Sequence, residues 1–407
     1  MRILIFEICP TGHRLQYVKV MLDTFCPLTN DIIFATSRNI ELTDEYTVHL
    51  KHVGHKFTLD ASAELNAGGT MTVSFRTFLH FYKIIKKYSP DYIYVPFADG
   101  LAQFLGIARL VGMSPLTNNA RMEILLMRGK IPQIETSFLN KLKTYAWLKT
   151  LELSGADTIH FLNPLQFSKI KESSYIKLAS RARLVPEPVE EMKSNSRSVA
   201  RKKLDIPVDG RYIACLGRLD TRKGVDLLVR SYANANLKIN DRLLLVGLAT
   251  PEIKYILDTE VKHLVKEGRI IHINRYVSQE ELEAGICAAD VVCTPYPAHF
   301  ISSGIVVRAA ALGKYILASN VGWMGEVVPE FDLGETCNVM DHEIFSSRIS
   351  TVLDNADSFL ISERRKRFVK YHSIRNFSAH LLTGIQKDLE LTSDVELTTW
   401  NWVVNAE

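Results

Sequence analysis

The stretch CLGRLDTRKGVDLLV, residues 215–229, joins a short apolar strand to an amphipathic helix through a turn rich in glycine and charge. The strand is predicted to end at Gly217, and a helix over 223–235 opens with Lys223 and Gly224. A strand followed by a crossover helix is typical of a parallel sheet, because parallel strands cannot be joined by a tight turn. The stretch therefore predicts an α/β fold.

The same alternation of short strands and longer helices runs along the rest of the chain, with one interruption. The interruption is LVPEPVEEMKSNSRSV, residues 184–199, whose prolines, charges and Ser/Asn run predict an interdomain linker. We expect strands before it at 2–8, 31–36, 92–96, 122–127 and 157–161, and after it at 211–216, 242–247, 270–274, 290–293 and 315–318. The chain is predicted to form two doubly wound Rossmann-like domains, residues 1–190 and 191–365, and a helical segment, 366–407, that packs back across them.

Length and composition agree with this organisation. The 407 residues exceed what one hydrophobic core usually organises, and 47% hydrophobic with 23% charged residues is a globular composition. A net charge of +4 is too small to indicate nucleic acid as a partner, but it suits anionic small molecules or an acidic membrane surface. The opening stretch becomes charged too early for a signal peptide, so we expect a cytoplasmic protein that can contact the inner face of the membrane.

Ligands of open α/β sheets bind beyond the carboxyl ends of the strands, so the strand-to-helix turns are the candidate sites. In the first turn, EICPTGHRLQYV, Gly12 permits close approach to a ligand and His13 opens a helix. In the turn at 215–229, Arg218 and Lys223 can lean over one strand end and clamp a diphosphate. The alternative is that Arg218 pairs with Asp220, and that Arg222 in the same turn pairs with an acid four residues further on.

A third candidate turn lies in HFISSGIVVRAAALGKYILAS, residues 299–319. Helix amide groups and two hydroxyls can hold phosphate oxygens at its entrance, which consists of Ser302, Ser303, Gly304 and Ile305. The alternative is that Ser302 is only the N-cap of the helix. His299, just before this entrance, can contact the same ligand or can be a surface hydrogen-bonding group.

Three segments in order resemble the GT-B glycosyltransferases of the glycogen-synthase-like superfamily, also called group 1 or family 4. The segment CLGRLDTRKGVDLLV is similar to the family's "vGRl…KGvdlLl", and IVVRAAALGKYILASNVGWMGEVV is similar to "lvllEAmacGkPVvasdvGg.pEvv". Between them, NRYVSQEELEAGICAADVVCTPYP resembles the run from the nucleotide loop to the "aDv…P" strand. The resemblance covers residues 184–340 well, and the amino-terminal half only through its opening strand and PDYIYV.

The resemblance implies a GT-B fold with two domains facing a central cleft, the first on the acceptor side and the second holding a nucleotide-sugar donor. It places Arg218 and Lys223 on the diphosphate and Gly12 beside the donor. The same comparison puts a loop beside the nucleobase, formed by Arg275, Tyr276 and Val277. Arg128 falls where many relatives place a histidine that faces the donor. No metal and no separate cofactor are implied.

The chain departs from the family at two positions. Family members usually carry two glutamates seven residues apart, E-x7-E, whereas Phe300 and Arg308 occupy the matching positions here. A guanidinium only donates hydrogen bonds, so Arg308 cannot replace a glutamate that accepts them from a ribose. Arg308 can instead reach an anionic group, pair with an acid such as Glu326, or cover its helix.

The sequence therefore predicts a metal-independent glycosyltransferase that moves a sugar from a nucleoside diphosphate to a saccharide or lipid-linked acceptor. Retention of the anomeric configuration and a role in surface polysaccharide or glycoconjugate biosynthesis follow from the resemblance. Two alternatives stay open: a non-catalytic GT-B subunit that binds nucleotide or glycan, and an inverting transferase that uses His13 as its base. The donor sugar, the acceptor and the oligomeric state are not predicted.

Overall fold

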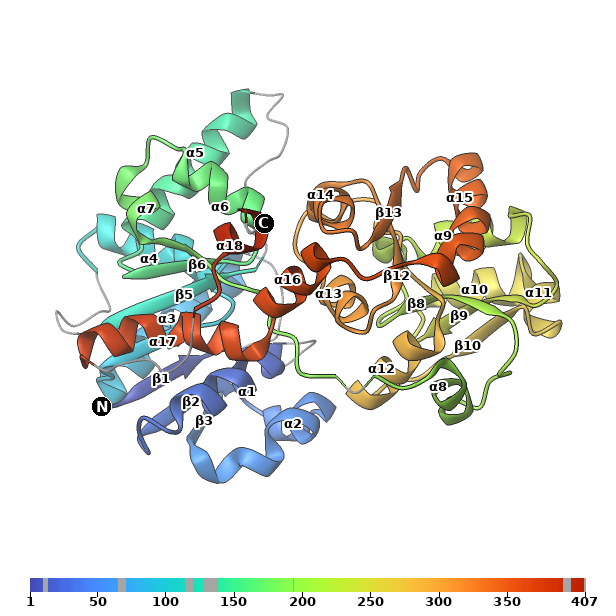
Figure 1. Ribbon diagram of the computed structural model, residues 1–407. Helices are drawn as coiled ribbons and strands as arrows, with labels where there is room; N and C mark the ends of the chain where they lie inside the picture. Colours follow the sequence, from blue (N-terminus) through green and yellow to red (C-terminus); the bar gives the residue numbers. More distant parts are fainter. Residues whose placement is uncertain are drawn as a thin grey trace. The chain divides into compact units, whose positions relative to one another are not determined.

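The computed structural model describes residues 1–9, 14–64, 71–113, 120–127, 138–192, 194–390 and 397–405. It divides into two compact units (Figure 1). Unit 1 comprises Met1–Pro186 and Phe377–Leu397, and unit 2 comprises Glu187–Asn376 and Thr398–Glu407. The division after Pro186 lies four residues before the predicted boundary at 190, and the predicted segment 366–407 is shared between the units.

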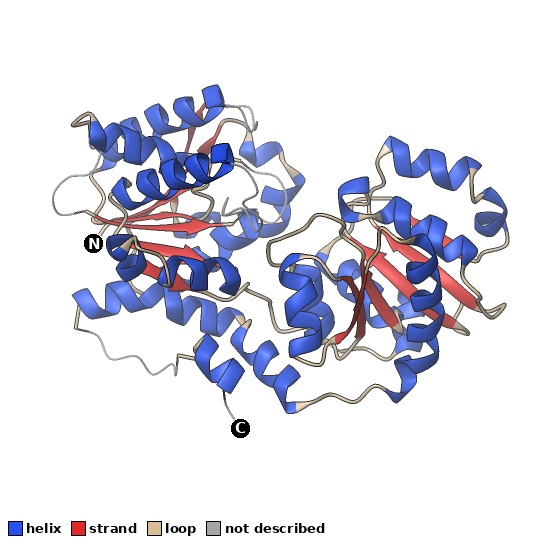
Figure 2. Cartoon of the chain, turned by 90° about the horizontal axis from the view of Figure 1, so that it is seen from above, coloured by secondary structure: helices blue, strands red, loops and turns tan. Residues whose placement is uncertain are grey.

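Unit 1 is built on a parallel sheet, for which the described residues provide seven strands in the order β3-β2-β1-β4-β5-β6-β7. The strands are β1 Ile3–Phe6, β2 Ile32–Ser37, β3 Thr58–Ala63, β4 Tyr92–Val95, β5 Arg121–Leu126, β6 Thr158–Phe161 and β7 Ala182–Leu184. Helices cover both faces of the sheet (Figure 2). They are α1 Arg14–Phe25, α2 Asp44–His49, α3 Met71–Tyr88, α4 Leu101–Leu110, α5 Phe138–Leu153, α6 Pro164–Lys171, α7 Ile176–Arg181 and most of α17 Ile374–Asp388.

Unit 2 repeats this architecture, with six described parallel strands in the order β10-β9-β8-β11-β12-β13. The strands are β8 Arg211–Leu216, β9 Asp241–Val246, β10 Ile270–Ile273, β11 Val291–Thr294, β12 Tyr315–Ser319 and β13 Gly334–Cys337. One face carries α8 Arg197–Lys203, α12 Gln279–Ala288, α13 Gly304–Ala311, α14 Gly322–Glu330, α16 Glu363–Tyr371 and α18 Trp400–Asn405. The other carries α9 Val225–Asn234, α10 Pro251–Thr259, α11 Lys262–Lys266 and α15 His342–Asn355.

The alternation of side chains along a strand explains why unit 2 has a core on each side of its sheet. In β8, Tyr212 and Ala214 belong to the cluster under α12 and α13, whereas Ile213 and Cys215 belong to the cluster under α9 and α15. Both sets are fully buried, so the strand is apolar from Tyr212 to Leu216, as expected for a sheet covered on both faces. The predicted fold class of two doubly wound domains is confirmed.

Both sheets change winding direction between their first and fourth strands. In unit 1, β1 lies beside β4, and in unit 2, β8 lies beside β11. The chain winds outward in opposite directions from each of these pairs. In open parallel sheets the crevice at the carboxyl ends of such a pair is the usual ligand site. The turns that follow β8 and β11 therefore lie at the switch point of unit 2.

Sequence reasoning missed three edge strands, β3, β7 and β13, of which β7 has only three residues. β3 and β13 read TLDASA and GETC, too polar to be recognised by an apolar run, because an edge strand is paired on one side only. The segment between β9 and β10 forms two helices, α10 and α11, separated at Glu260 and Val261.

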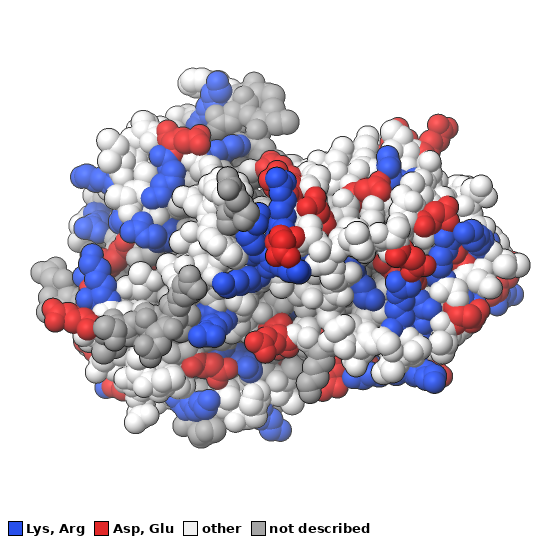
Figure 3. Space-filling model, viewed as in Figure 1, with Lys and Arg blue, Asp and Glu red and all other residues white. Residues whose placement is uncertain are grey.

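Lysine and arginine side chains are interspersed with aspartate and glutamate on the face of the molecule drawn in Figure 3. The view therefore shows no broad area of one charge, in keeping with the small net charge. In the described parts of the chain, no helix combines the length and the apolar character that crossing a bilayer requires.

Candidate functional site

The turn between β8 and α9 is held by two glycines with left-handed backbone angles, Gly217 at φ 91° and Gly224 at φ 64°. Between them, the Asp220 side chain accepts a hydrogen bond of 3.0 Å from the backbone N–H of Lys223 and caps a short 3-10 turn, η3 Thr221–Lys223. A β-carbon on Gly224 would lie 2.0 Å from the carbonyl oxygen of Pro295. The turn after β8 therefore packs directly on the loop after β11.

The Lys223 ammonium lies over the carboxyl end of β8, as the sequence predicted. Its Nζ donates a hydrogen bond of 3.1 Å to the carbonyl of Leu216, and it lies 5.5 Å from the centroid of the Tyr296 ring. A β-carbon on Gly217 would come within 2.8 Å of the same Nζ, so a side chain there would collide with the lysine. Burial lowers the pKa of Lys223. Within the described residues, Lys223 forms no ion pair.

Arg218 and Arg222 take a different position from Lys223. Arg218 is 73% exposed, and its Nε lies 3.7 Å from the Asp220 carboxylate. Arg222 also borders Asp220, at 3.6 Å, while Asp226 is approached by Arg230 at 3.8 Å. The pairing of Arg218 with Asp220 thus matches the alternative interpretation, whereas the predicted pairing of Arg222 with an acid four residues on is wrong. Arg218 keeps the freedom of an exposed side chain.

The loop between β11 and α13 is built around a buried tyrosine. The Tyr296 hydroxyl forms a hydrogen bond with Ser303, and its ring meets the ring of His299 edge to face at 5.1 Å between centroids. His299 Nε2 lies 3.2 Å from the carbonyl oxygen of Ser302. Burial lowers the pKa of His299 to about 4, so the ring is neutral at physiological pH and donates its Nε2 proton to that carbonyl.

The helix entrance differs from the prediction at Ser302. The N-cap residue of α13 is Ser303, whose side chain makes no capping hydrogen bond, so the interpretation of Ser302 as the N-cap is wrong. Ser302 Oγ instead donates a hydrogen bond of 2.8 Å to Oε2 of Glu187. Glu187 is 7% exposed and belongs to the stretch predicted as a linker. Sequence reasoning missed this glutamate, because 115 residues separate it from Ser302.

Gly304 and Ile305 form the first turn of α13, where backbone N–H groups have no partner inside the helix. Arg308 follows one turn later, and its Nη1 donates to the carbonyl of Gly304 at 3.3 Å. Phe300, at the other position where the family usually has a glutamate, is 43% exposed. Glu187 also borders this helix entrance, because its Oε1 would lie 3.6 Å from a β-carbon on Gly304.

The loop predicted to border the nucleobase follows β10. Arg275 donates a hydrogen bond to Glu281, a residue that also completes the capping box of α12 with Ser278. Tyr276 is 53% exposed, and Val277 packs against the core. The loop therefore exposes the Tyr276 ring, while Val277 and the cap of α12 hold the loop against unit 2.

The described structure thus brings Lys223 together with Tyr296, His299 and the Ser302–Ser303 entrance at the point where the second sheet changes direction. Three predicted site residues, Gly12, His13 and Arg128, lie outside the described residues. Across the described ranges, no three His, Cys, Asp or Glu side chains gather as a metal ion would require.

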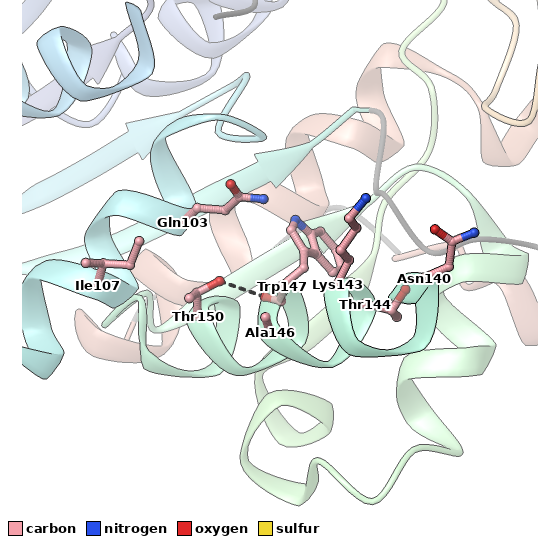
Figure 4. A pocket seen from close by; sticks show the side chains of 8 residues that line it. All are labelled: Gln103, Ile107, Asn140, Lys143, Thr144, Ala146, Trp147 and Thr150. Carbon is pink, nitrogen blue, oxygen red and sulfur yellow. Dashed lines mark hydrogen bonds between the residues drawn. The ribbon is translucent and has the colours of Figure 1, made fainter. Parts of the chain in front are cut away.

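Unit 1 has a pocket of about 460 Å³ between α4 and α5, drawn in Figure 4. The two helices pack so closely that a β-carbon on Gly106 would lie 2.0 Å from the carbonyl oxygen of Thr150. Trp147 is buried against this contact, while Tyr145 on the same helix is 57% exposed. The pocket is lined by Gln103, Ile107, Asn140, Lys143, Thr144, Ala146, Trp147 and Thr150. Its lining has one cation, Lys143, and no glycine.

Residues 196–374, which lie within unit 2, match the family described as Glycosyl transferases group 1. The chain is also similar to a D-inositol 3-phosphate glycosyltransferase of Corynebacterium aurimucosum, 29% identical over 161 residues that make up 38% of each chain. The chain therefore spans well under half the length of the curated relatives that it matches.

Two solved structures share the fold over nearly the whole chain. A sucrose-phosphate synthase of Thermosynechococcus elongatus superposes with a TM-score of 0.73 at 16% identity, covering 96% of this chain and 99% of that one. Anabaena HepE in complex with UDP gives 0.67 at 13% identity and covers 95% and 100%; the same protein has been solved with UDP-glucose. The predicted GT-B fold is confirmed.

Proposed function

Since unit 2 carries a group 1 glycosyl transferase domain on a GT-B fold, we propose that the protein transfers a sugar from a nucleoside diphosphate to a hydroxyl of a saccharide or lipid-linked acceptor. The D-inositol 3-phosphate glycosyltransferase relative and the Anabaena protein bound to UDP and UDP-glucose support this class of reaction. A role in surface polysaccharide or glycoconjugate biosynthesis is part of the proposal.

The observation that carries the proposal is the ammonium of Lys223. It lies at the switch point of the second sheet, beside the loop that leads into α13, and forms no ion pair with any described carboxylate. A buried cation without a counterion is costly, and an anionic ligand compensates that cost. A diphosphate supplies the charge, and the first turn of α13 supplies backbone donors for its oxygens.

The proposed chemistry uses these groups to stabilise the leaving group. As the bond between the sugar and the phosphate breaks, negative charge accumulates on the nucleoside diphosphate, where Lys223 and the amides of Gly304 and Ile305 act as fixed donors. Arg218 is exposed and can swing onto the same phosphates. The charge that develops is thus balanced by protein groups, and we propose that no metal ion is needed.

We also propose that the reaction retains the anomeric configuration of the donor sugar. The leaving phosphate oxygen can take the proton of the acceptor hydroxyl on the face where the new bond forms, so no carboxylate base is required. His299 is neutral and hydrogen-bonded to the Ser302 carbonyl, which suits a structural role better than proton transfer. Under this proposal the lack of glutamate at Phe300 and Arg308 leaves the reaction intact.

The test is binding followed by product analysis. UDP, GDP and ADP and their glucose or mannose adducts are screened for a rise in the midpoint of thermal unfolding, since a ligand of the native state must stabilise it. The best donor is then incubated with lipid-linked and free saccharide acceptors, and the anomeric configuration of the product is read by NMR. A protein that no nucleotide stabilises at saturation contradicts the proposal, whereas binding with no transfer to any acceptor favours a non-catalytic subunit.

A further inference from the structure

The pair formed by Glu187 and Ser302 has a definite hydrogen-bond direction. Ser302 Oγ donates its single proton to Oε2 of Glu187 at 2.8 Å, and the carboxylate oxygen accepts it. The Oγ atom then has only acceptor capacity left for a ligand. A phosphate oxygen at neutral pH is itself an acceptor, so it gains nothing from Ser302 Oγ. A sugar hydroxyl, which can donate, is the matching partner.

The pair is built into the fold and is not a chance surface contact. The backbone N–H of Glu187 donates to Nδ1 of His372 at 3.0 Å, and the Glu187 carbonyl oxygen lies 3.3 Å from the same nitrogen. Burial lowers the pKa of His372 to about 3, so the ring is neutral. The carbonyl of Ser302 is fixed by His299 at 3.2 Å. Backbone contacts therefore hold both partners, and the hydroxyl has little freedom to turn its proton toward a ligand.

Arg308 completes the arrangement. A β-carbon on Gly304 would lie 2.7 Å from Arg308 Nη1 and 3.6 Å from Glu187 Oε1, so the guanidinium and the carboxylate border the same glycine. Arg308 and Oε1 of Glu187 thus lie on the side of Gly304, while Ser302 donates to the other carboxylate oxygen, Oε2. A glycine at 304 leaves the space that both side chains use.

We infer that Glu187 and Ser302 form a subsite that accepts a hydrogen bond from a hydroxyl of the donor sugar, while the phosphates are bound by Lys223 and the α13 amides. Ser302 is the group that touches the sugar, and Glu187 is a positioning residue that orients the Ser302 hydroxyl. The inference rests on the proposed function, and it replaces the expectation that the Ser302 hydroxyl binds phosphate. Glu187, from the segment after β7, thus places a carboxylate at this helix entrance.

The test distinguishes a contact of Ser302 with the sugar from a contact with the phosphates. Affinities for UDP and UDP-glucose, or for GDP and GDP-mannose if the guanosine series binds, are measured by calorimetry for the wild type, Ser302→Ala, Ser302→Thr and Glu187→Gln. We expect Ser302→Ala to bind the free nucleoside diphosphate as the wild type does and to bind the nucleotide sugar about tenfold more weakly, the loss of one hydrogen bond of about 1.4 kcal/mol. Ser302→Thr restores the affinity, and Glu187→Gln loses part of it.

Deoxyfluoro donors decide the direction of the hydrogen bond, because fluorine cannot donate a proton. Fluorine at one sugar position should weaken binding to the wild type about tenfold and have no effect on Ser302→Ala. The matched controls are Ser347→Ala, on an exposed face of α15, and Glu335→Gln, a partly buried carboxylate of β13 that binds Arg348 at 2.6 Å; both should bind like the wild type.

Two results would overturn the inference. One is a Ser302→Ala variant that loses affinity for the free nucleoside diphosphate as strongly as for the nucleotide sugar, since Ser302 would then contact phosphate. The other is a fluorine effect that is the same in both proteins at every position. Failure of the wild type to bind any nucleotide instead contradicts the proposed function. Circular dichroism of Glu187→Gln checks that the variant is folded.

Discussion

The switch points of the two sheets have the same topology but opposite electrostatics. In unit 1, Glu7 follows β1 and pairs with Arg14 at 3.0 Å, and the Arg14 guanidinium lies 4.4 Å from the centroid of the Phe97 ring, just after β4. In unit 2, Lys223 follows β8 and faces Tyr296 after β11, with no carboxylate paired to it within the described residues. Both sites place a cation over an aromatic ring.

The two switch points differ in whether the cation has a counterion within its own unit. Glu7 is 3% exposed and pairs with Arg14 inside unit 1, so Arg14 has an internal counterion whenever Glu7 is ionised. Lys223 forms no ion pair within the described residues, so it lacks the internal counterion that Arg14 has. A fold that occurs twice in one chain thus serves stability at one switch point and, under the proposed function, ligand binding at the other.

The largest expected effect comes from Gly224→Ala, which breaks the contact between the two turns of unit 2. A left-handed backbone costs alanine about 1–2 kcal/mol, and the clash of its β-carbon with the Pro295 carbonyl adds about 1–3 kcal/mol. We expect a loss of unfolding free energy of about 3 kcal/mol in urea titrations, together with loss of nucleotide binding.

Gly268→Ala is the matched control for that variant. Gly268 also has a left-handed backbone, φ 69°, but a β-carbon there would meet nothing within 4 Å. It should cost only the backbone strain, about 1–2 kcal/mol, and leave nucleotide binding intact. Equal destabilisation of the two variants would show that the turns after β8 and β11 do not pack as described.

Lys223→Met tests whether the ammonium at the switch point of unit 2 serves nucleotide binding and not stability. Affinity for a nucleoside diphosphate should fall about 100-fold or more, equivalent to about 2.7 kcal/mol, because a charged hydrogen-bond donor to phosphate is lost. The unfolding free energy should stay the same or rise, since an unpaired buried cation is removed. Calorimetry and urea unfolding give the two values.

Lys238→Met provides the control at the opposite end of the sheet. Lys238 lies just before β9 and pairs with Asp354 at 3.1 Å, away from the carboxyl ends of the strands. Its removal should leave nucleotide affinity unchanged. If Lys223→Met and Lys238→Met bound the nucleotide equally well, the contrast between the two switch points would be lost.

Arg14→Met in unit 1 should lower stability, unlike Lys223→Met in unit 2. It removes the partner of a buried carboxylate, and we expect a loss of about 2 kcal/mol of unfolding free energy at pH 8. The loss should shrink at pH 5, where Glu7 becomes protonated and needs no counterion. Lys19→Met, which breaks the surface pair with Asp23 on the same helix, should cost about 0.5 kcal/mol at most and show no such pH dependence. An equal cost for both variants would mean that the Glu7 pair has no special role.

The last prediction concerns Glu7→Gln and its dependence on pH. Burial raises the pKa of Glu7 to about 7, although Arg14 opposes the shift, so the folded state binds a proton between about pH 4.5 and 7 that the unfolded state has lost. The stability of the wild type should therefore fall as pH rises through this window, and Glu7→Gln should lack this fall. We expect the variant to gain about 1–3 kcal/mol relative to the wild type between pH 4.5 and 8, measured by urea unfolding.

The exposed Glu41→Gln in the same unit serves as the reference for that pH series, because its side chain is open to solvent. Its stability relative to the wild type should not change with pH. A Glu7→Gln variant that followed Glu41→Gln over the whole range would show that Glu7 has an ordinary pKa, and would remove the electrostatic difference between the switch points.

Much of the second site could be predicted from local pattern. The turn after β8 can be recognised in the sequence from Gly217, Lys223 and Gly224. A positive φ favours glycine and a helix start favours a capping residue, and both requirements are local. Arg218 was predicted beside Lys223, but the structure has it exposed and next to Asp220. Which of two neighbouring cations turns inward depends on packing against Tyr296, and no spacing in the sequence encodes that contact.

The sequence by itself determined the alternation of strands and helices, the break into two doubly wound domains, and the glycine turn that ends β8 and precedes α9. These follow from periodicity, from chain chirality and from backbone angles that few residues can adopt. The tertiary structure alone decided that Glu187 meets Ser302 and that Arg308 borders the same glycine as Glu187. The physical reason is that a side-chain hydrogen bond across 115 residues depends on how the segment after β7 runs along the second sheet, and no local preference of either residue specifies that course.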